Sequence, residues 1–297
     1  MEFLEITFQT AGISTYAFLP PLVALMISFF TSMAGVSGAF LLLPFQISIL
    51  GFATPSVSAT NLLYNVVGTP GGVASYFKRK RILWPLIACI LSGSVPGVLI
   101  GYYFRVTLLP DPKTFKLFIG IVLLYVGWRL FLDLRHHRTK KLKNKNSGFH
   151  IRQISFKLKI VHFKFGNKDV YFNAAIVLGF SLIVGIISGI YGIGGGAIIS
   201  PFLVTILGLP IYAVAGAVLA ANFTTSLAGM IFYSTIPLHH GNASPPDFLL
   251  GFLFGVGGLF GMYFGAKVQH RVPEATIKMI LLAIVVTVSV KYIFQFF

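Results

Sequence analysis

The glycine-rich stretch GIYGIGGGAIISPF, residues 189–202, interrupts a long apolar run and contains no charged residue. A break in the helix at Gly192 to Gly196 would leave backbone N–H groups unpaired at the start of the next helix, and that helix end carries partial positive charge. Such an end binds anions, and glycine lets a ligand or a neighbouring backbone approach closely. The same glycines are also compatible with a tight turn between two packed helices.

A second group of candidate residues consists of amides and hydroxyls placed inside apolar segments. They are Thr60, Asn61, Asn65, Asn222, Thr224, Thr225 and Ser226. An uncompensated polar group in such a segment costs free energy, and neutral donors can bind an oxyanion reversibly. The alternative role is hydrogen bonding between helices, worth roughly 0.6 kcal/mol per bond.

The carboxylates are informative by their positions. All seven fall in loops or at segment ends: Glu2, Glu5, Asp111, Asp133, Asp169, Asp247 and Glu274. No carboxylate is therefore placed at mid-membrane as a proton relay or cation ligand, which disfavours a metal-ion transporter or a carboxylate-driven proton pump. The apolar segments also lack a Ser–His pair, an Asp pair and a His/Glu cluster, so we expect no enzyme, no metal site and no cofactor.

The composition predicts an all-α polytopic membrane protein. Of 297 residues, 56% are hydrophobic and 10% are charged, so most windows of about 20 residues are long and apolar enough to span a bilayer. A soluble fold or a transmembrane barrel with alternating segments fits poorly. The net charge of +16 comes from Lys and Arg at segment ends, which indicates membrane topology rather than nucleic-acid binding. The single Cys89 is interpreted as a packing residue.

The apolar segments form two sets separated by a basic stretch. They cover residues 16–33, 36–51, 56–77, 83–104 and 115–132, then 170–191, 193–209, 211–235, 248–266 and 275–297. We expect a first transmembrane repeat at 1–132, a basic cytoplasmic linker at 133–168 and a second repeat at 169–297. Within the linker, FKLKIVHFKF predicts a short hairpin or an element lying on anionic headgroups, with a solvated loop as the alternative.

The two sets resemble each other. GVSGAFLLLPF (35–45) aligns with GIGGGAIISPF (192–202), which places Gly38 on Gly195 and Pro44 on Pro201. ATNLLYNVVG (59–68) then aligns with AANFTTSLAG (220–229) after a shift of about one helical turn. Blocks matching in the same order indicate a duplication.

The basic residues give the orientation of each half. KRKR at 78–81 follows the third segment of the first half, whereas the equivalent loop at 234–247 has no Lys or Arg. Equivalent loops should therefore face opposite sides, with the N-terminus outside and the linker inside. The loop containing Arg105, Lys113 and Lys116 is a weak exception. The early acidic residues lead us to expect that the first apolar segment is retained. Segments 36–51 and 193–209 either span the membrane or re-enter.

GIGGGAIISPFL (192–203) with LGLP (207–210), the duplication, and GMYFGAK (261–267) together resemble the TauE/SafE sulfite-exporter family of membrane permeases. The resemblance implies movement of sulfite, sulfoacetate or other sulfonates across a bacterial or archaeal cytoplasmic membrane. The first half departs from the usual second G-x-G-G-G and reads GVSGA (35–39). Either Ser37 supplies a hydroxyl there or that half is structural.

We therefore expect two inverted-topology repeats of about five hydrophobic segments each, with glycine-broken helices meeting near the membrane midplane. The predicted substrate-binding residues are Ser37, Gly38, Asn61, Asn65, Gly194, Gly195, Gly196, Asn222, Thr224 and Thr225. The expected partners are a small anion and the lipid bilayer, with anionic headgroups near the linker, no nucleic acid, and a homodimer as one assembly. The predicted function is anion export by alternating access. Rival hypotheses are a passive anion channel, a permease for small carboxylates, an intramembrane enzyme and an interaction protein that uses the linker.

Overall fold

The computed structural model describes residues 5–33, 36–78, 82–136, 151–157, 160–165, 168–209, 211–237, 243–268 and 274–297. Within them, six helices are long and apolar enough to cross a membrane, which confirms a polytopic membrane protein. They are α5 (Trp84–Thr107), α6 (Pro112–His136), α7 (Ala174–Tyr191), α9 (Ile211–Thr235), α10 (Phe248–Val268) and α11 (Glu274–Phe294). The shorter helices are α1 (Leu19–Met33), α2 (Ala39–Ser48), α3 (Ser56–Gly68), α4 (Pro70–Lys78) and α8 (Gly196–Thr205).

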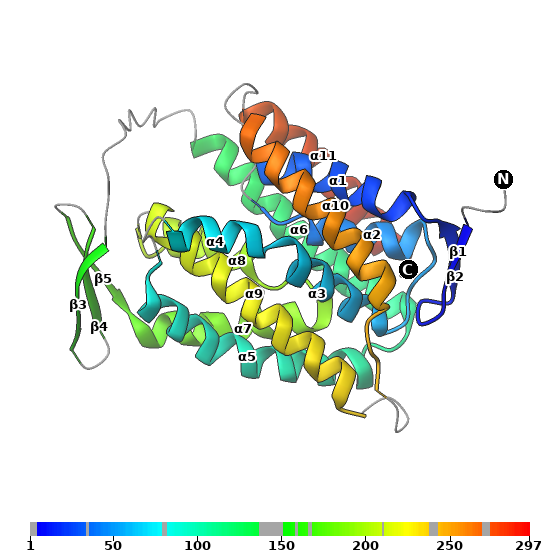
Figure 1. Cartoon of the computed structure of the whole chain (residues 1–297), viewed down its shortest axis with the longest axis horizontal. Helices are drawn as coiled ribbons and strands as arrows, with labels where there is room; N and C mark the ends of the chain where they lie inside the picture. The colour runs from blue at the N-terminus through cyan, green and yellow to red at the C-terminus, as the bar shows by residue number, and fades with distance from the viewer. Residues whose placement is uncertain are drawn as a thin grey trace.

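The expectation of an all-helical fold is wrong in one respect, because short strands are present as well. A hairpin of β1 (Glu5–Phe8) and β2 (Ile13–Tyr16) precedes α1. Part of the predicted linker and the first residues of the predicted second repeat form an antiparallel sheet of β3 (Ile151–Lys157), β4 (Ile160–Phe165) and β5 (Lys168–Asn173). Apolar residues alternate with polar ones along β1 and from Val161 to Phe165 in β4, and that period suits a pleated strand rather than a helix. The hairpin and the sheet lie at opposite ends of the helical bundle (Figure 1).

The predicted segment 56–77 is two helices rather than one. α3 ends at Gly68 and α4 begins at Pro70. Proline has no backbone N–H and its ring crowds the preceding turn, so it starts a helix more readily than it continues one. The corresponding segment of the second half, α9, runs unbroken from Ile211 to Thr235.

Two helix pairs form the closest contacts in the bundle: α5 packs along α7, and α10 packs along α1. Glycines spaced four residues apart line both contacts, so they fall on one face of each helix. On α5 they are Gly93, Gly97 and Gly101. On α10 they are Gly257, Gly261 and Gly265. A Cβ at any of these positions would overlap a backbone oxygen of the facing helix, so the close approach requires glycine.

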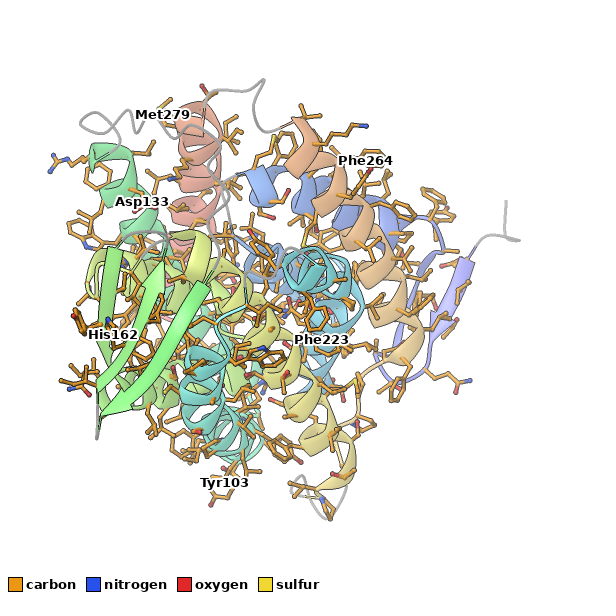
Figure 2. All side chains as sticks on the ribbon, turned by 60° about the vertical axis from the view of Figure 1, so that its left-hand side comes forward. Tyr103, Asp133, His162, Phe223, Phe264 and Met279 are labelled. Atoms are coloured by element: carbon orange, nitrogen blue, oxygen red, sulfur yellow. The ribbon has the colours of Figure 1, made fainter. Side chains whose placement is uncertain are left out.

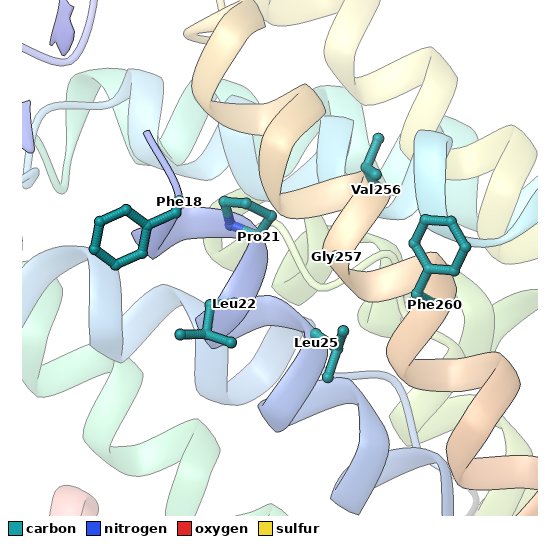
Figure 3. A pocket seen from close by; sticks show the side chains of 7 residues that line it. All are labelled: Phe18, Pro21, Leu22, Leu25, Val256, Gly257 and Phe260. Atoms are coloured by element: carbon teal, nitrogen blue, oxygen red, sulfur yellow. The ribbon is translucent and has the colours of Figure 1, made fainter. Parts of the chain in front are cut away.

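The outer surface of the bundle is apolar. Tyr103 of α5, Phe264 of α10 and Met279 of α11 point away from the bundle and are about half exposed (Figure 2). A shallow groove between α1 and α10 is lined by apolar side chains (Figure 3). Such a surface suits contact with lipid chains, and nothing in the groove would recognise an anion.

Candidate functional site

The break between α7 and α8 centres on three glycines with left-handed backbones. α7 ends at Tyr191 and α8 begins at Gly196. Gly192, Gly194 and Gly195 have φ of 83°, 73° and 84°. Residues with a Cβ rarely adopt these angles, so the turn shape depends on glycine. We call residues 192–195 the α7–α8 turn.

Hydrogen bonds from α3 and α9, and one from Tyr191 to α2, fix the position of this turn. Ser58 Oγ of α3 donates to the Ile190 carbonyl at 2.7 Å, and Tyr233 Oη of α9 donates to the Gly189 carbonyl at 2.8 Å. Tyr191 Oη reaches the Phe40 carbonyl of α2 at 2.7 Å. All three donor side chains are fully buried. The turn is therefore held by both halves of the chain.

Asn61 and Asn65 of α3 use their amide groups to hold the same turn. Both Nδ2 atoms donate to the Gly192 carbonyl, at 3.2 Å and 3.4 Å. Asn61 Nδ2 also donates to the Ala39 carbonyl at 2.9 Å, and Ser37 Oγ donates to Asn65 Oδ1 at 3.0 Å. Because these donors already have partners, the three side chains position the starts of α2 and α8.

Asn222 of α9 lies against the start of α8. Its Oδ1 accepts a hydrogen bond from the Gly196 N–H at 3.1 Å, and the side chain is buried. A Cβ on Gly194 would overlap Asn222 Oδ1 and lie 2.6 Å from Ser226 Oγ, so only glycine fits between them. Asn222 Nδ2 donates to no atom in the described part of the chain.

Several hydrogen-bond donors around the turn have no partner among the described residues. The N–H groups of Ile193, Gly194 and Gly195 make no hydrogen bond there. The hydroxyls of Ser188 and Ser226 are fully buried and also lack a partner. Buried polar groups are nearly always paired, so this concentration of donors calls for an acceptor. The start of α8 adds partial positive charge, and that combination suits an anion.

The equivalent point in the first half is filled by protein. Tyr64 Oη is hydrogen-bonded to Ser28 Oγ at 2.7 Å and lies 2.6 Å from where a Cβ of Gly38 would be. Gly38 has φ of −66°, an ordinary helical value, and Ala39 N donates to Ser37 Oγ at 3.4 Å. Its aligned partner Gly195 is instead left-handed. Gly35, aligned with Gly192, lies outside the described residues.

The two predicted threonines lie on different faces of α9, one exposed and one buried. Thr224 is exposed and its hydroxyl donates to the Ala220 carbonyl of its own helix at 3.1 Å, so the structure does not bring it to the turn. Thr225 is buried, and its hydroxyl pairs with Ser94 Oγ of α5 at 2.8 Å. Four of the predicted residues therefore carry the unpaired donors or lie next to them: Gly194, Gly195, Gly196 and Asn222.

Sequence reasoning missed Ser188, Gln46 and Tyr64, and it left Ser226 outside the predicted site. Gln46 is fully buried; its Nε2 donates to Asn61 Oδ1 at 3.5 Å and its Oε1 has no partner among the described residues. A lone amide within LLLPFQISIL (41–50) was the available signal for Gln46. Ser188 and Tyr64 gave no such signal, because a single small hydroxyl or phenol is common in apolar helices. Groups of His, Cys, Asp and Glu that could hold a metal ion are absent from the described residues.

Comparison with known proteins finds a family of membrane transporters. A family model described as "Sulfite exporter TauE/SafE" matches residues 21–292. Two similar proteins of Bacillus subtilis (strain 168) are the probable membrane transporter proteins YunE and YjnA. YunE is 21% identical over 244 residues, which is 82% of each chain. YjnA is 22% identical over 282 residues, covering 92% of this chain and 98% of that protein. No solved structure matches.

Proposed function

The chain belongs to the sulfite exporter TauE/SafE family of membrane transporters, and from this premise we propose that it exports small oxyanions, most specifically sulfite or organosulfonates, by alternating access. The observation that carries the proposal is the set of unpaired donors at the start of α8. Backbone N–H groups of the α7–α8 turn and the hydroxyls of Ser188 and Ser226 would replace part of the water around the anion.

The packing of the helices supports two inverted repeats. α5 of the first half packs on α7 of the second, and α10 of the second half packs on α1 of the first. If α1 corresponds to α7 and α5 to α10, these are the same contact made twice. α6 also packs on α11, and α3 packs on α9, so each of these helices contacts its own equivalent in the other half. Such exchange of equivalent contacts is expected when a two-fold axis relates the halves, and the opposite sides predicted for equivalent loops would place that axis in the membrane plane.

The ends of the bundle support the proposed orientation in the cell membrane. The β1–β2 hairpin and the β3–β5 sheet lie at opposite ends (Figure 1). If the basic linker is cytoplasmic, the hairpin is external, and the sheet lies where anionic headgroups are available. The inside-negative membrane potential would then favour exit of an anion by about 2.3 kcal/mol per charge per 100 mV.

Neutral donors suit a carrier because it must release what it binds. Each hydrogen bond from a neutral donor to an anion contributes a modest free energy of binding. A buried cation fixed at the turn itself would hold the anion more strongly. Rocking of one repeat against the other would expose the α7–α8 turn to each side in sequence. During that motion the turn would move with Tyr233 of its own half, and the hydrogen bond from Ser58 of the other half would have to break or shift.

Counterflow in proteoliposomes tests the proposal. Purified protein is loaded with unlabelled sulfite, and uptake of labelled sulfite is measured against competing sulfonates, carboxylates and sulfate. Saturable exchange competed by sulfonates is the expected result. Competition by carboxylates alone would reassign the substrate, and channel-like flux without counterflow would replace the carrier by a passive anion channel.

Two variants connect the exchange to the proposed site. Ser226→Ala and Asn222→Ala should each raise the half-saturating sulfite concentration about tenfold, the effect of losing one hydrogen bond to a charged group. Ser92→Ala is the matched control, because Ser92 is exposed and its hydroxyl donates only to the Ala88 carbonyl of its own helix. Equal half-saturation in all three variants would remove the α7–α8 turn from the substrate path.

A further inference from the structure

Arg105 is a fully buried cation in a helix that is long and apolar enough to cross the membrane. It was expected in an external loop, but it lies in the last turn of α5 with 0% of its side chain exposed. Charged side chains at membrane depth are costly and usually mark a functional pathway. The proposed function above has not used this residue.

Neutral groups hold the guanidinium in place. Nη1 donates to the Leu109 carbonyl, and Nη2 donates to the Ala53 carbonyl at 3.1 Å. The Phe115 ring lies 3.6 Å from the guanidinium carbon. Within the described residues Arg105 has no carboxylate partner, whereas the other buried cation, Lys278, is paired with Asp133 at 3.5 Å. The positive charge of Arg105 is therefore oriented but not neutralised by those residues.

The guanidinium of Arg105 has an N–H donor that makes no hydrogen bond to the described residues. Nε is buried and makes no hydrogen bond to the described residues. Guanidinium has five N–H groups in a planar fork, and the two bonds to Leu109 and Ala53 use only part of them. Nε–H together with a neighbouring N–H matches two oxygens of a sulfite, sulfonate or carboxylate group. An anion would both neutralise the charge and satisfy Nε.

Arg105 is connected to the α7–α8 turn through Tyr233. Tyr102 lies about one turn before Arg105 on α5, and Tyr233 Oη donates to the Gly189 carbonyl just before the turn. The ring of Tyr102 packs on that of Tyr233 with centroids 4.4 Å apart. Gly101, one turn before Arg105, faces Gly189 of α7, so Arg105 lies near the level of the α7–α8 turn, at the end of α5 opposite to Trp84.

We propose that Arg105 is a second anion-binding group, which receives the oxyanion near the α7–α8 turn, at the membrane face where α5 ends. This inference rests on the proposed function, because it assumes that an anion passes through the turn. Binding there requires an open conformation, since the side chain is fully buried in this one. The site takes a group with two coplanar oxygens and net negative charge.

The test measures the half-saturating concentration of methanesulfonate and of sulfite in counterflow, with Arg105→Met and Arg105→Lys. Arg105→Met should raise it about tenfold, as expected for losing a charge-assisted hydrogen bond. Arg105→Lys should give a smaller rise of severalfold, because the charge remains but the fork is lost. Lys278→Met is the matched control: it removes another buried cation and should leave half-saturation unchanged.

The outcomes separate this inference from the proposed function. If the wild type exchanges sulfite and Arg105→Met has the same half-saturation, Arg105 is structural and the proposed function stands. If the folded wild type exchanges no anion, both proposals are wrong. A purely structural role would lower the yield or maximal rate of Arg105→Met without moving half-saturation. If that variant does not fold, Arg105→Lys decides, and an unchanged half-saturation in it overturns the bidentate site.

Discussion

Replacing Gly194 by alanine tests whether the shape of the α7–α8 turn creates the anion site. Gly194 has φ of 73°, and an alanine in that left-handed region costs roughly 1–2 kcal/mol. The new Cβ would also displace Asn222 Oδ1, which accepts from the Gly196 N–H at 3.1 Å. Losing that bond adds about 1 kcal/mol. We expect a destabilisation of about 2–3 kcal/mol and the loss of most anion exchange.

Gly208→Ala is the matched control for that variant. Gly208 also has a left-handed backbone, with φ of 65°, but a Cβ there would meet nothing within 4 Å. It should cost the same roughly 1–2 kcal/mol of backbone strain and leave counterflow near the wild-type rate. Thermal unfolding in detergent measures the loss of stability, and proteoliposome exchange measures the counterflow rate. If Gly194→Ala exchanges sulfite as well as Gly208→Ala does, the fit of Asn222 and Ser226 around Gly194 does not matter for transport.

Three further variants test the surrounding framework. Gly97→Ala should lower the unfolding temperature, because its Cβ would overlap a backbone oxygen of α7. Gly179→Ala is the control, because a Cβ there would meet nothing within 4 Å. Equal unfolding temperatures for the two variants would mean that α5 and α7 can move apart without loss of stability. Tyr233→Phe should reduce stability by about 1 kcal/mol, seen in thermal unfolding, by removing the donor to the Gly189 carbonyl. Asp247→Ala should cost about 1 kcal/mol, because Oδ1 accepts from the Leu250 N–H at the start of α10. It should also speed proteolysis of the β1–β2 hairpin, since Asp247 Oδ2 accepts from the Ala11 N–H at 3.2 Å; an unchanged cleavage rate would show that this bond does not hold the hairpin.

The sequence indicated the family and most of the apolar helices because both depend on local features, although the predicted segment 56–77 is two helices. Long apolar runs and glycine clusters can be recognised without knowing their neighbours. The faces of the helices could not be predicted in the same way. Thr224 and Thr225 are adjacent and of one type, yet one is exposed and the other buried. In a helix that is apolar all round, periodicity does not identify the face that points inward.

The role of each amide also depends on contacts between distant residues. Asn61 and Asn65 lie more than 120 positions before Gly192, whose carbonyl they share. Sequence gives the presence of a donor but not whether protein or ligand accepts its hydrogen bond. Arg105 shows the same limit: its place near a segment end indicated a loop, although the helix continues past it to Thr107 and buries it.

The two halves share one sequence pattern, but the hydroxyl groups at the starts of α2 and α8 differ in whether they are hydrogen-bonded to protein. At Gly38 the hydroxyl of Tyr64 occupies the available space and is paired with Ser28. In the second half, Gly194, next to the aligned Gly195, lies between Asn222 and Ser226, and Ser226 has no partner among the described residues. An oxyanion would therefore find free donors on the second-half side and paired groups on the first-half side. Under the proposed function, the second half would therefore bind the substrate directly, while Asn61 and Asn65 of the first half fix the turn by donating to the Gly192 carbonyl.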